Sequence, residues 1–288
     1  MADLSSATPC PVCEAARPRY MTQRMRNGIT YHLARCCRCG QHYCDPAPTA
    51  DEIRSFYEGD YHQELRTIGG TEREFGNKYV RYRDWIVTFI QTGRTIDIGT
   101  ATGMLPALLK DAGFQAEGVE YSRSSAEWGS AQFGVPIRIG GAELVAQETA
   151  AFDLISMTDV LEHTEHPLRT LQSLRASLKP YGLMLITFPD IRSAESRYEQ
   201  FMAKLAHRKW LWSSCHIPLH VWEFTHATAC RMFELAGFQV VGFRRSQIRQ
   251  DGASGLQRIL RFPLRILNAE IIAKAMGTQM EFVIRRID

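Results

Sequence analysis

The chain contains 288 residues, of which 45% are hydrophobic and 23% are charged, and its formal net charge is +3. This length accommodates one large α/β domain with a small additional module. The charge is too small to indicate nucleic-acid binding by itself, the polar N-terminus has no apolar signal segment, and no run of about 18 apolar residues predicts a membrane span. We therefore expect a cytoplasmic protein, in which the 8 cysteines are metal ligands or buried thiols rather than disulfides.

Six of the cysteines lie before residue 45. Cys10 and Cys13 form one C-x-x-C knuckle and Cys36 and Cys39 form a second, which is the ligand pattern of a tetrahedral structural zinc site. Cys37 is an alternative to Cys36, although the two-residue gap favours Cys36, and unligated buried thiols are an alternative to the metal. A catalytic zinc is disfavoured because four thiolates close the coordination shell. We expect a zinc ribbon with a core of its own.

The ribbon is expected at residues 1–48 and is followed by a segment of helical character. Thr49 fits the N-cap of a helix that starts at Asp51, and apolar residues recur at helical spacing between 75 and 91. We therefore expect a helical connector over 49–92.

From residue 95 onward, predicted strands and helices alternate. Strict alternation implies a parallel sheet with right-handed crossovers. Two insertions interrupt it, at about 190–222 and 250–277, and the first is rich in aromatic and basic residues. The expected strands cover 95–98, 115–120, 136–139, 152–157, 183–188, 239–244 and 279–286, and the expected helices cover 104–112, 123–133, 142–148, 167–178 and 225–236.

The first strand runs into a tight turn that contains Gly99 and Gly103, and the second strand ends on Glu120, about 20 positions after the turn. Glycines let a backbone approach a ligand closely, and a carboxylate can accept hydrogen bonds from two ribose hydroxyls. The segment therefore indicates half of a nucleotide-binding unit. It lacks the middle glycine of G-x-G-x-x-G, which disfavours a nicotinamide oxidoreductase.

Three segments resemble class I S-adenosylmethionine (SAM) dependent methyltransferases. Residues 97–103 (DIGTATG) resemble motif I, 152–163 (FDLISMTDVLEH) resemble the fourth strand with its loop, and 178–187 (LKPYGLMLIT) resemble the approach to the fifth strand. The resemblance covers about 93–245. It implies a Rossmann-like, mostly parallel sheet of seven strands with an antiparallel last strand, in a SAM-binding methyltransferase domain over 93–288. Ala101 replaces a glycine common in the family, which is tolerable if its φ angle is negative.

The resemblance also implies which residues bind SAM. The turn, with Gly99, Thr100 and Gly103, would contact the methionine part, and Asp97 would hold its ammonium group. Glu120 would take the ribose hydroxyls. Tyr121, Ala142 and Glu143 would lie at the adenine, and Asp159 and Val160 would lie beneath the sulfonium.

His163 is the candidate general base, because an imidazole can accept a hydroxyl proton near neutral pH. A loop-holding role is the alternative. A third possibility is that Asp159, Glu162 and His163 share one face of a helical turn and hold a divalent metal, with a fourth ligand from 220–224. This last arrangement resembles that of ubiquinone-pathway O-methyltransferases and small-RNA 2′-O-methyltransferases.

We expect a SAM-dependent methyltransferase that acts on a small molecule, at oxygen. The stretch from Cys39 onward resembles methyltransferases with an N-terminal ribbon that are associated with sugar, lipid-linked glycan or secondary-metabolite tailoring, so a sugar, a glycolipid or a natural-product intermediate is the expected acceptor. The alternatives are an RNA methyltransferase that uses the basic ribbon, or a non-catalytic SAM-binding adaptor. Residues 256–276 are expected to form a dimer contact or ordinary packing, with weak peripheral membrane contact as an alternative. The oligomeric state is not predicted.

Overall fold

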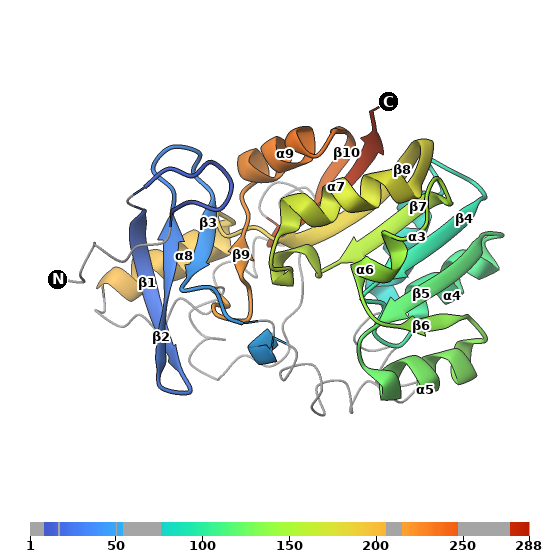
Figure 1. Ribbon diagram of the computed structural model, residues 1–288, viewed down its shortest axis with the longest axis horizontal. Coiled ribbons are helices and arrows are strands. Elements are labelled where there is room, and N and C mark those ends of the chain that lie inside the picture. Colours follow the sequence, from blue (N-terminus) through green and yellow to red (C-terminus); the bar gives the residue numbers. More distant parts are fainter. Residues whose placement is uncertain are drawn as a thin grey trace.

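The computed structural model describes residues 9–16, 18–49, 51–53, 76–205, 215–246 and 277–287, and these form two β-sheets (Figure 1). The larger sheet lies at the right of Figure 1 and the smaller one at the left. Strand β9, which belongs to the smaller sheet, lies between the bodies of the two.

The larger sheet has seven strands in the spatial order β10-β11-β8-β7-β4-β5-β6. All neighbouring pairs are parallel except those of β11, which runs antiparallel to both β8 and β10. This confirms the predicted Rossmann-like fold with its antiparallel last strand. The strands are β4 (Arg94–Ile98), β5 (Gln115–Glu120), β6 (Ile137–Ile139), β7 (Phe152–Thr158), β8 (Leu178–Pro189), β10 (Phe238–Ser246) and β11 (Gln279–Arg286).

Helices cover both faces of this sheet, as the continuous apolar sequence of β8 requires. Successive strand residues point to opposite faces, so Met184 and Ile186 pack with helices α7 and α9, while Leu183 and Leu185 pack with α3 and α4. The helices near the sheet are α3 (Asn77–Ile86), α4 (Met104–Asp111), α5 (Arg123–Phe133), α6 (Ala142–Val145), α7 (Pro167–Ser177) and α9 (His226–Leu235), and helix α8 (Ala194–Leu205) lies near the smaller sheet.

The smaller sheet is an antiparallel meander completed by a strand from the first insertion. Its strands, in spatial order, are β1 (Arg19–Arg26), β2 (Ile29–Arg35), β3 (His42–Asp45) and β9 (Trp222–Glu223). Cys10, Cys36 and Tyr43 belong to the same buried cluster as α7, α9 and one face of the larger sheet. The expectation of a separate ribbon core is therefore wrong, because β9 joins the ribbon to the rest of the protein.

The described part of the connector agrees with the predicted helices. Residues 51–53 are helical, and Thr49 Oγ1 accepts a hydrogen bond from the backbone N–H of Glu52. The predictions for 54–75, for the aromatic stretch 206–214 and for 256–276 lie outside the described residues. Among the described helices, none combines the length and the apolar character needed to cross a bilayer.

Candidate active site and four-cysteine site

The turn after β4 adopts a left-handed conformation at both of its predicted glycines. Gly99 has φ +71° and Gly103, the N-cap of α4, has φ +79°. A Cβ atom on Gly99 would lie 2.5 Å from Cγ2 of Val160, and one on Gly103 would lie 2.7 Å from Cδ1 of Ile137. Both positions therefore require glycine, and Gly99 brings the turn against the loop after β7.

Ala101 also has a positive φ, of +51°. The expectation of a negative φ is wrong, because the backbone N–H of Ala101 donates a 2.8 Å hydrogen bond to Oε2 of Glu120 and the turn has to follow it. A left-handed alanine costs about 1–2 kcal/mol. Thr100 is fully buried beside Gly118, and its N–H donates to the carbonyl of Val119 over 3.1 Å.

Two buried carboxyl groups lie at the carboxyl ends of β4 and β5. Asp97 Oδ1 accepts a 2.6 Å hydrogen bond from Ser156 Oγ, while Asp97 Oδ2 is buried with no hydrogen-bond partner in the described part of the chain. Burial raises the pKa of Asp97 to about 7. Burial also raises the pKa of Glu120, whose Oε1 accepts from the Ser122 N–H. An unpartnered buried oxygen on Asp97 fits a cationic ligand group such as the ammonium of SAM.

The residues predicted at the adenine are brought together at the ends of β5 and β6. The Tyr121 hydroxyl donates to Oε2 of Glu143 over 3.1 Å, and the Gly141 N–H donates to Oε1 of the same carboxylate over 2.8 Å. Ala142 is half-buried at the start of α6, and Tyr121 is exposed. An exposed aromatic ring beside a carboxylate can accept a planar base.

Asp159 lies directly after β7, with φ +58°, and its carboxylate binds residues that sequence reasoning missed. Lys78 Nζ donates to Oδ2 over 2.5 Å, and the Gln279 amide and the Thr187 hydroxyl donate to Oδ1. Burial opposes ionisation of Asp159, but the Lys78 ammonium outweighs it and holds the pKa of this carboxyl below its usual value. Asp159 is therefore an anion paired with the ammonium group of Lys78, which lies on α3, before the SAM motif in the sequence.

The predicted shared face of Asp159, Glu162 and His163 is wrong, because the 3-10 helix η4 (Leu161–His163) begins only after Asp159. The other members of the predicted set do converge: ligand atoms of Glu162, His163 and His220, the last from the predicted 220–224 segment, lie within 4.8 Å of one another. Both carboxyl oxygens of Glu162 are buried, without a hydrogen-bond partner among the described residues. Burial, followed by the charge of Asp159, raises the pKa of Glu162 well above its usual value.

His163 lies in this cluster as a neutral imidazole. Its Nδ1 is 2.9 Å from the carbonyl oxygen of Leu219, and because a carbonyl can only accept, Nδ1 carries the proton. Loss of contact with water, followed by the proximity of His220, lowers the pKa of His163 to about 3. Its Nε2 therefore presents a lone pair, which is the state of a metal-ligating histidine whose other nitrogen is held by a carbonyl.

A second group overlaps the first and was not predicted as a set. His216, His220 and Glu223 also place ligand atoms within 4.8 Å of one another. His220 Nδ1 lies 3.3 Å from Oε1 of Glu223, and the backbone N–H of His216 donates to the same oxygen. Burial raises the pKa of Glu223 to about 7. The end of the first insertion and the residue that follows it, Glu223, thus supply three donor side chains to the region after β7.

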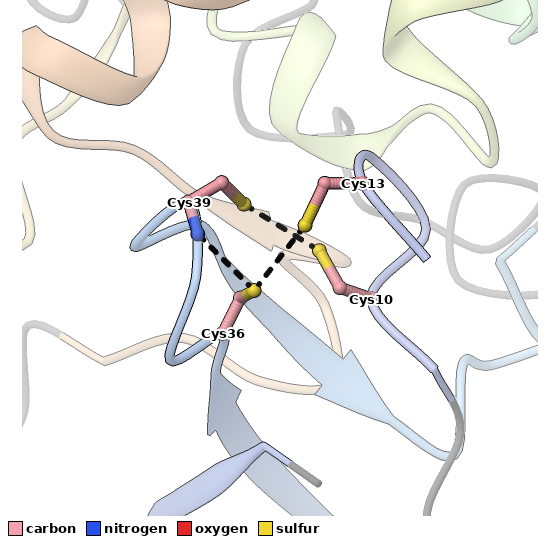
Figure 2. Close-up of side chains that lie close together, drawn as sticks. All are labelled: Cys10, Cys13, Cys36 and Cys39. Carbon is pink, nitrogen blue, oxygen red and sulfur yellow. Dashed lines mark hydrogen bonds between the residues drawn. The ribbon is translucent and has the colours of Figure 1, made fainter. Parts of the chain in front are cut away.

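The four predicted cysteines converge, as Figure 2 shows, with Cys10 and Cys13 on the loop before β1 and Cys36 and Cys39 on the turn after β2. The Sγ atoms of Cys10 and Cys39 are 3.6 Å apart, and those of Cys13 and Cys36 are 3.5 Å apart. Burial opposes ionisation, but the backbone N–H groups of Cys39 and Arg38 lower the pKa of Cys36 to about 6. Cys37 is exposed and outside the cluster. Four converging sulfurs fit a tetrahedral Zn²⁺.

Comparison with known proteins assigns the fold and its reaction class. Residues 72–242, more than half of the chain, match a family model described as a methyltransferase domain. The chain belongs to this family. It carries a SAM-dependent methyltransferase domain, and this agrees with the glycine turn and the carboxylates at the ends of β4 and β5.

Among curated proteins, the methyltransferase is similar to ubiquinone biosynthesis O-methyltransferases. The one from Ralstonia nicotianae is 28% identical over 34% of this chain and 45% of its own length, and the one from Paraburkholderia phymatum is 28% identical over 31% and 41%. The matches thus span less than half the length of these relatives. The relatives do not favour the RNA-binding and adaptor alternatives.

Solved structures share the fold at low identity. A SAM-dependent methyltransferase from Archaeoglobus fulgidus superimposes with a TM-score of 0.55 at 17% identity, covering 79% of this chain and all of that one. The [4+2]-cyclase SpnF superimposes with a TM-score of 0.58 at 16% identity, covering 84% and 98%. These likenesses concern the fold alone.

Proposed function

We propose that the methyltransferase transfers the methyl group of SAM to a hydroxyl oxygen of a small molecule, with a divalent cation held by Glu162, His163 and His220. The observation that carries the proposal is the carboxyl group of Glu162, whose two oxygens are buried beside two imidazoles and have no hydrogen-bond partner within the described ranges. A buried carboxyl in this condition is costly unless a cation accompanies it.

The chain binds SAM through the turn after β4 and through the carboxyl groups of Asp97 and Glu120. Gly99, Thr100 and Gly103 form the tight turn that would approach the methionine part of SAM, and Oδ2 of Asp97 would accept a hydrogen bond from its ammonium group. Glu120 fixes the turn through the Ala101 N–H, and its carboxylate would accept hydrogen bonds from the ribose hydroxyls of SAM. SAM supplies an electrophilic methyl group, so the enzyme's task is to position the acceptor in line with it.

The donor set fits a divalent cation. Glu162 supplies a carboxylate, while His163 and His220 supply nitrogens, and the Leu219 carbonyl fixes the tautomer of His163. A cation bound there would lower the pKa of an acceptor hydroxyl. Asp159 remains engaged with Lys78 and orders the loop that leads into η4.

His163 as a general base is the second candidate. A pKa of about 3 makes this imidazole a weak proton acceptor at neutral pH, and its Nδ1 proton is already donated to Leu219. The structure therefore gives more support to the cation.

The acceptor is proposed from similarity and from sequence. The curated relatives act, by their names, as O-methyltransferases, which supports oxygen as the acceptor atom. The ribbon-containing sequence pattern supports a sugar, a glycolipid or a natural-product intermediate. We also propose a structural Zn²⁺ at Cys10, Cys13, Cys36 and Cys39, on the convergence of their sulfurs.

The test is turnover of SAM with a panel of hydroxylated acceptors, in zinc-loaded protein, with Mg²⁺, Mn²⁺ or Co²⁺ added or withheld. We expect activity to require the added ion, and Glu162→Gln to lose at least 100-fold in rate while SAM affinity is kept. Glu165→Gln, an exposed acid three residues further on, is the matched control. Full activity of the parent protein without an added ion, together with full activity of Glu162→Gln, would refute the proposed cation. If only His163→Ala then lost activity strongly, His163 would be assigned as the general base.

A further inference from the structure

The four-cysteine turn and the candidate cation site are connected by strand pairing. β3 pairs antiparallel with β9, with His42 opposite Glu223 and Tyr43 opposite Trp222. The backbone N–H of Cys44 extends the pairing with a 2.8 Å hydrogen bond to the carbonyl of Val221. The ribbon therefore contacts, through its main chain, the insertion segment that carries His220 and Glu223.

Gln41 makes this connection at a single residue. Its carbonyl accepts a 2.9 Å hydrogen bond from the N–H of Cys36, inside the second knuckle. Its side-chain amide donates to the carbonyls of Glu223, over 3.1 Å, and of His42, over 2.9 Å. Gln41 is only 2% exposed, so these bonds are made away from water.

The other side of β9 is fixed to the loop that carries His163. Trp222 Nε1 donates to the carbonyl of Thr164 over 2.9 Å, and the Nδ1 proton of His163 goes to Leu219 in the insertion. The segment with His220 and Glu223 is thus held between Gln41 on one side and the loop after β7 on the other. If either attachment is lost, the donor atoms are free to separate.

We infer that Gln41 is a positioning residue of the cation site, through which the four-cysteine turn sets the place of His220 and Glu223. The cation in this inference rests on the proposed function, whereas the positioning of His220 and Glu223 by Gln41 is independent of it. Buried polar groups that orient metal ligands typically change metal affinity by about 10–100-fold when they are removed. The ribbon would then serve the active site directly, by completing it.

The test compares Gln41→Met, which keeps side-chain length but donates no hydrogen bond, with Tyr20→Phe. Tyr20 donates to Asp45 Oδ2 over 2.6 Å, so its hydrogen bond lies within the ribbon. Three quantities are measured in zinc-loaded protein: Mn²⁺ affinity by electron paramagnetic resonance, amide hydrogen exchange of peptides covering 215–224, and SAM affinity by calorimetry.

We expect Gln41→Met to weaken Mn²⁺ binding at least tenfold and to speed exchange in 215–224, with zinc content and SAM affinity unchanged, while Tyr20→Phe changes none of these. Unchanged exchange and unchanged Mn²⁺ affinity in Gln41→Met would overturn the inference. If Gln41→Met loses SAM binding, Gln41→Asn takes its place, and loss of SAM binding in that variant as well would mean a general structural role and would also overturn it. If the parent protein binds no Mn²⁺, the proposed cation fails, and exchange in 215–224 alone decides the positioning.

Discussion

Lys78 on α3 and Asp159 after β7 form an ion pair, with the ammonium nitrogen 2.5 Å from Oδ2 of the carboxylate. The two side chains retain 19% and 29% of their exposure, so the pair is partly screened by solvent. The pair ties the connector helix to the loop that leads into η4. Asp159 is paired with Lys78, and it does not belong to the group of donor side chains that contains Glu162.

Lys78→Met should destabilise the protein, because it leaves the carboxylate of Asp159 partly buried without its cation. We expect a loss of about 1–3 kcal/mol in the free energy of unfolding, less than for a fully buried pair. The double variant Lys78→Met/Asp159→Asn should recover part of the loss. Denaturant unfolding of the two single variants and the double variant measures the coupling, and a coupling near zero would show that the pair is not stabilising.

Much of the fold was predictable because the hydrophobic patterns of its strands and helices are local in the sequence. The central strands β7 and β8 are apolar on both faces, and the strands alternate with amphipathic helices. The described strands follow the predicted ranges, with β8 starting earlier, at Leu178. The antiparallel β11 was predicted only from the family resemblance, since a strand's direction has no sequence signal of its own.

What could not be predicted depends on contacts between distant parts of the chain. β9 has two residues, too few for any periodicity, and it pairs with β3, which lies far away in the sequence: Gln41 and Glu223 are 182 positions apart. The pairing fixes the end of the local turn that carries His216 and His220, through the bond from the Cys44 N–H to the Val221 carbonyl. Glu162 and His163 were visible in their motif, but the orientation of Asp159 toward Lys78 was not, because Lys78 lies on a helix before the motif begins.

Ala101→Gly should stabilise the protein. Glycine adopts the φ of +51° without the clash that a Cβ atom causes, and the hydrogen bond from residue 101 to Glu120 uses only backbone atoms. The greater freedom of glycine in the unfolded chain offsets part of the gain, so we expect about 0.5–1 kcal/mol. Thermal unfolding without SAM provides the measurement, with Ala107→Gly, in the middle of α4, as a control that should destabilise. A lower melting temperature for Ala101→Gly would contradict the strain at this position.

SAM affinity should increase with pH up to about 7. Burial raises the pKa of Asp97 to about 7, so below that pH the carboxyl must lose a proton before it can pair with the ammonium of SAM. Affinity should therefore fall about tenfold for each pH unit below 7 and level off above it. In the protein without SAM the sign is opposite: the neutral Asp97 contributes stability that is complete below the unfolded pKa, about 4, and is lost as pH rises through 7.

Calorimetric titrations with SAM between pH 5.5 and 8 test this linkage, and Asp97→Asn is the matched variant. We expect Asp97→Asn to bind SAM more weakly, with an affinity that changes much less with pH. Any dependence that remains would report Glu120, whose pKa burial also raises. An identical slope in Asp97→Asn would assign the linkage to another group.

Cys39→Ser should damage the whole protein rather than the ribbon alone. Cys36 belongs to the same buried cluster as the α7 and α9 face of the larger sheet, and Cys39 packs against that cluster, so loss of the metal site exposes a shared core. Structural zinc sites contribute folding energy directly, and we expect a loss on the order of 3 kcal/mol, in one unfolding transition, with weaker SAM binding. Cys37→Ser, at an exposed thiol outside the cluster, should keep one zinc per chain and full stability. Three measurements separate the outcomes: zinc content, denaturant unfolding and SAM affinity. If the ribbon of Cys39→Ser unfolds in a separate transition while SAM binding is intact, β9 does not couple the two sheets.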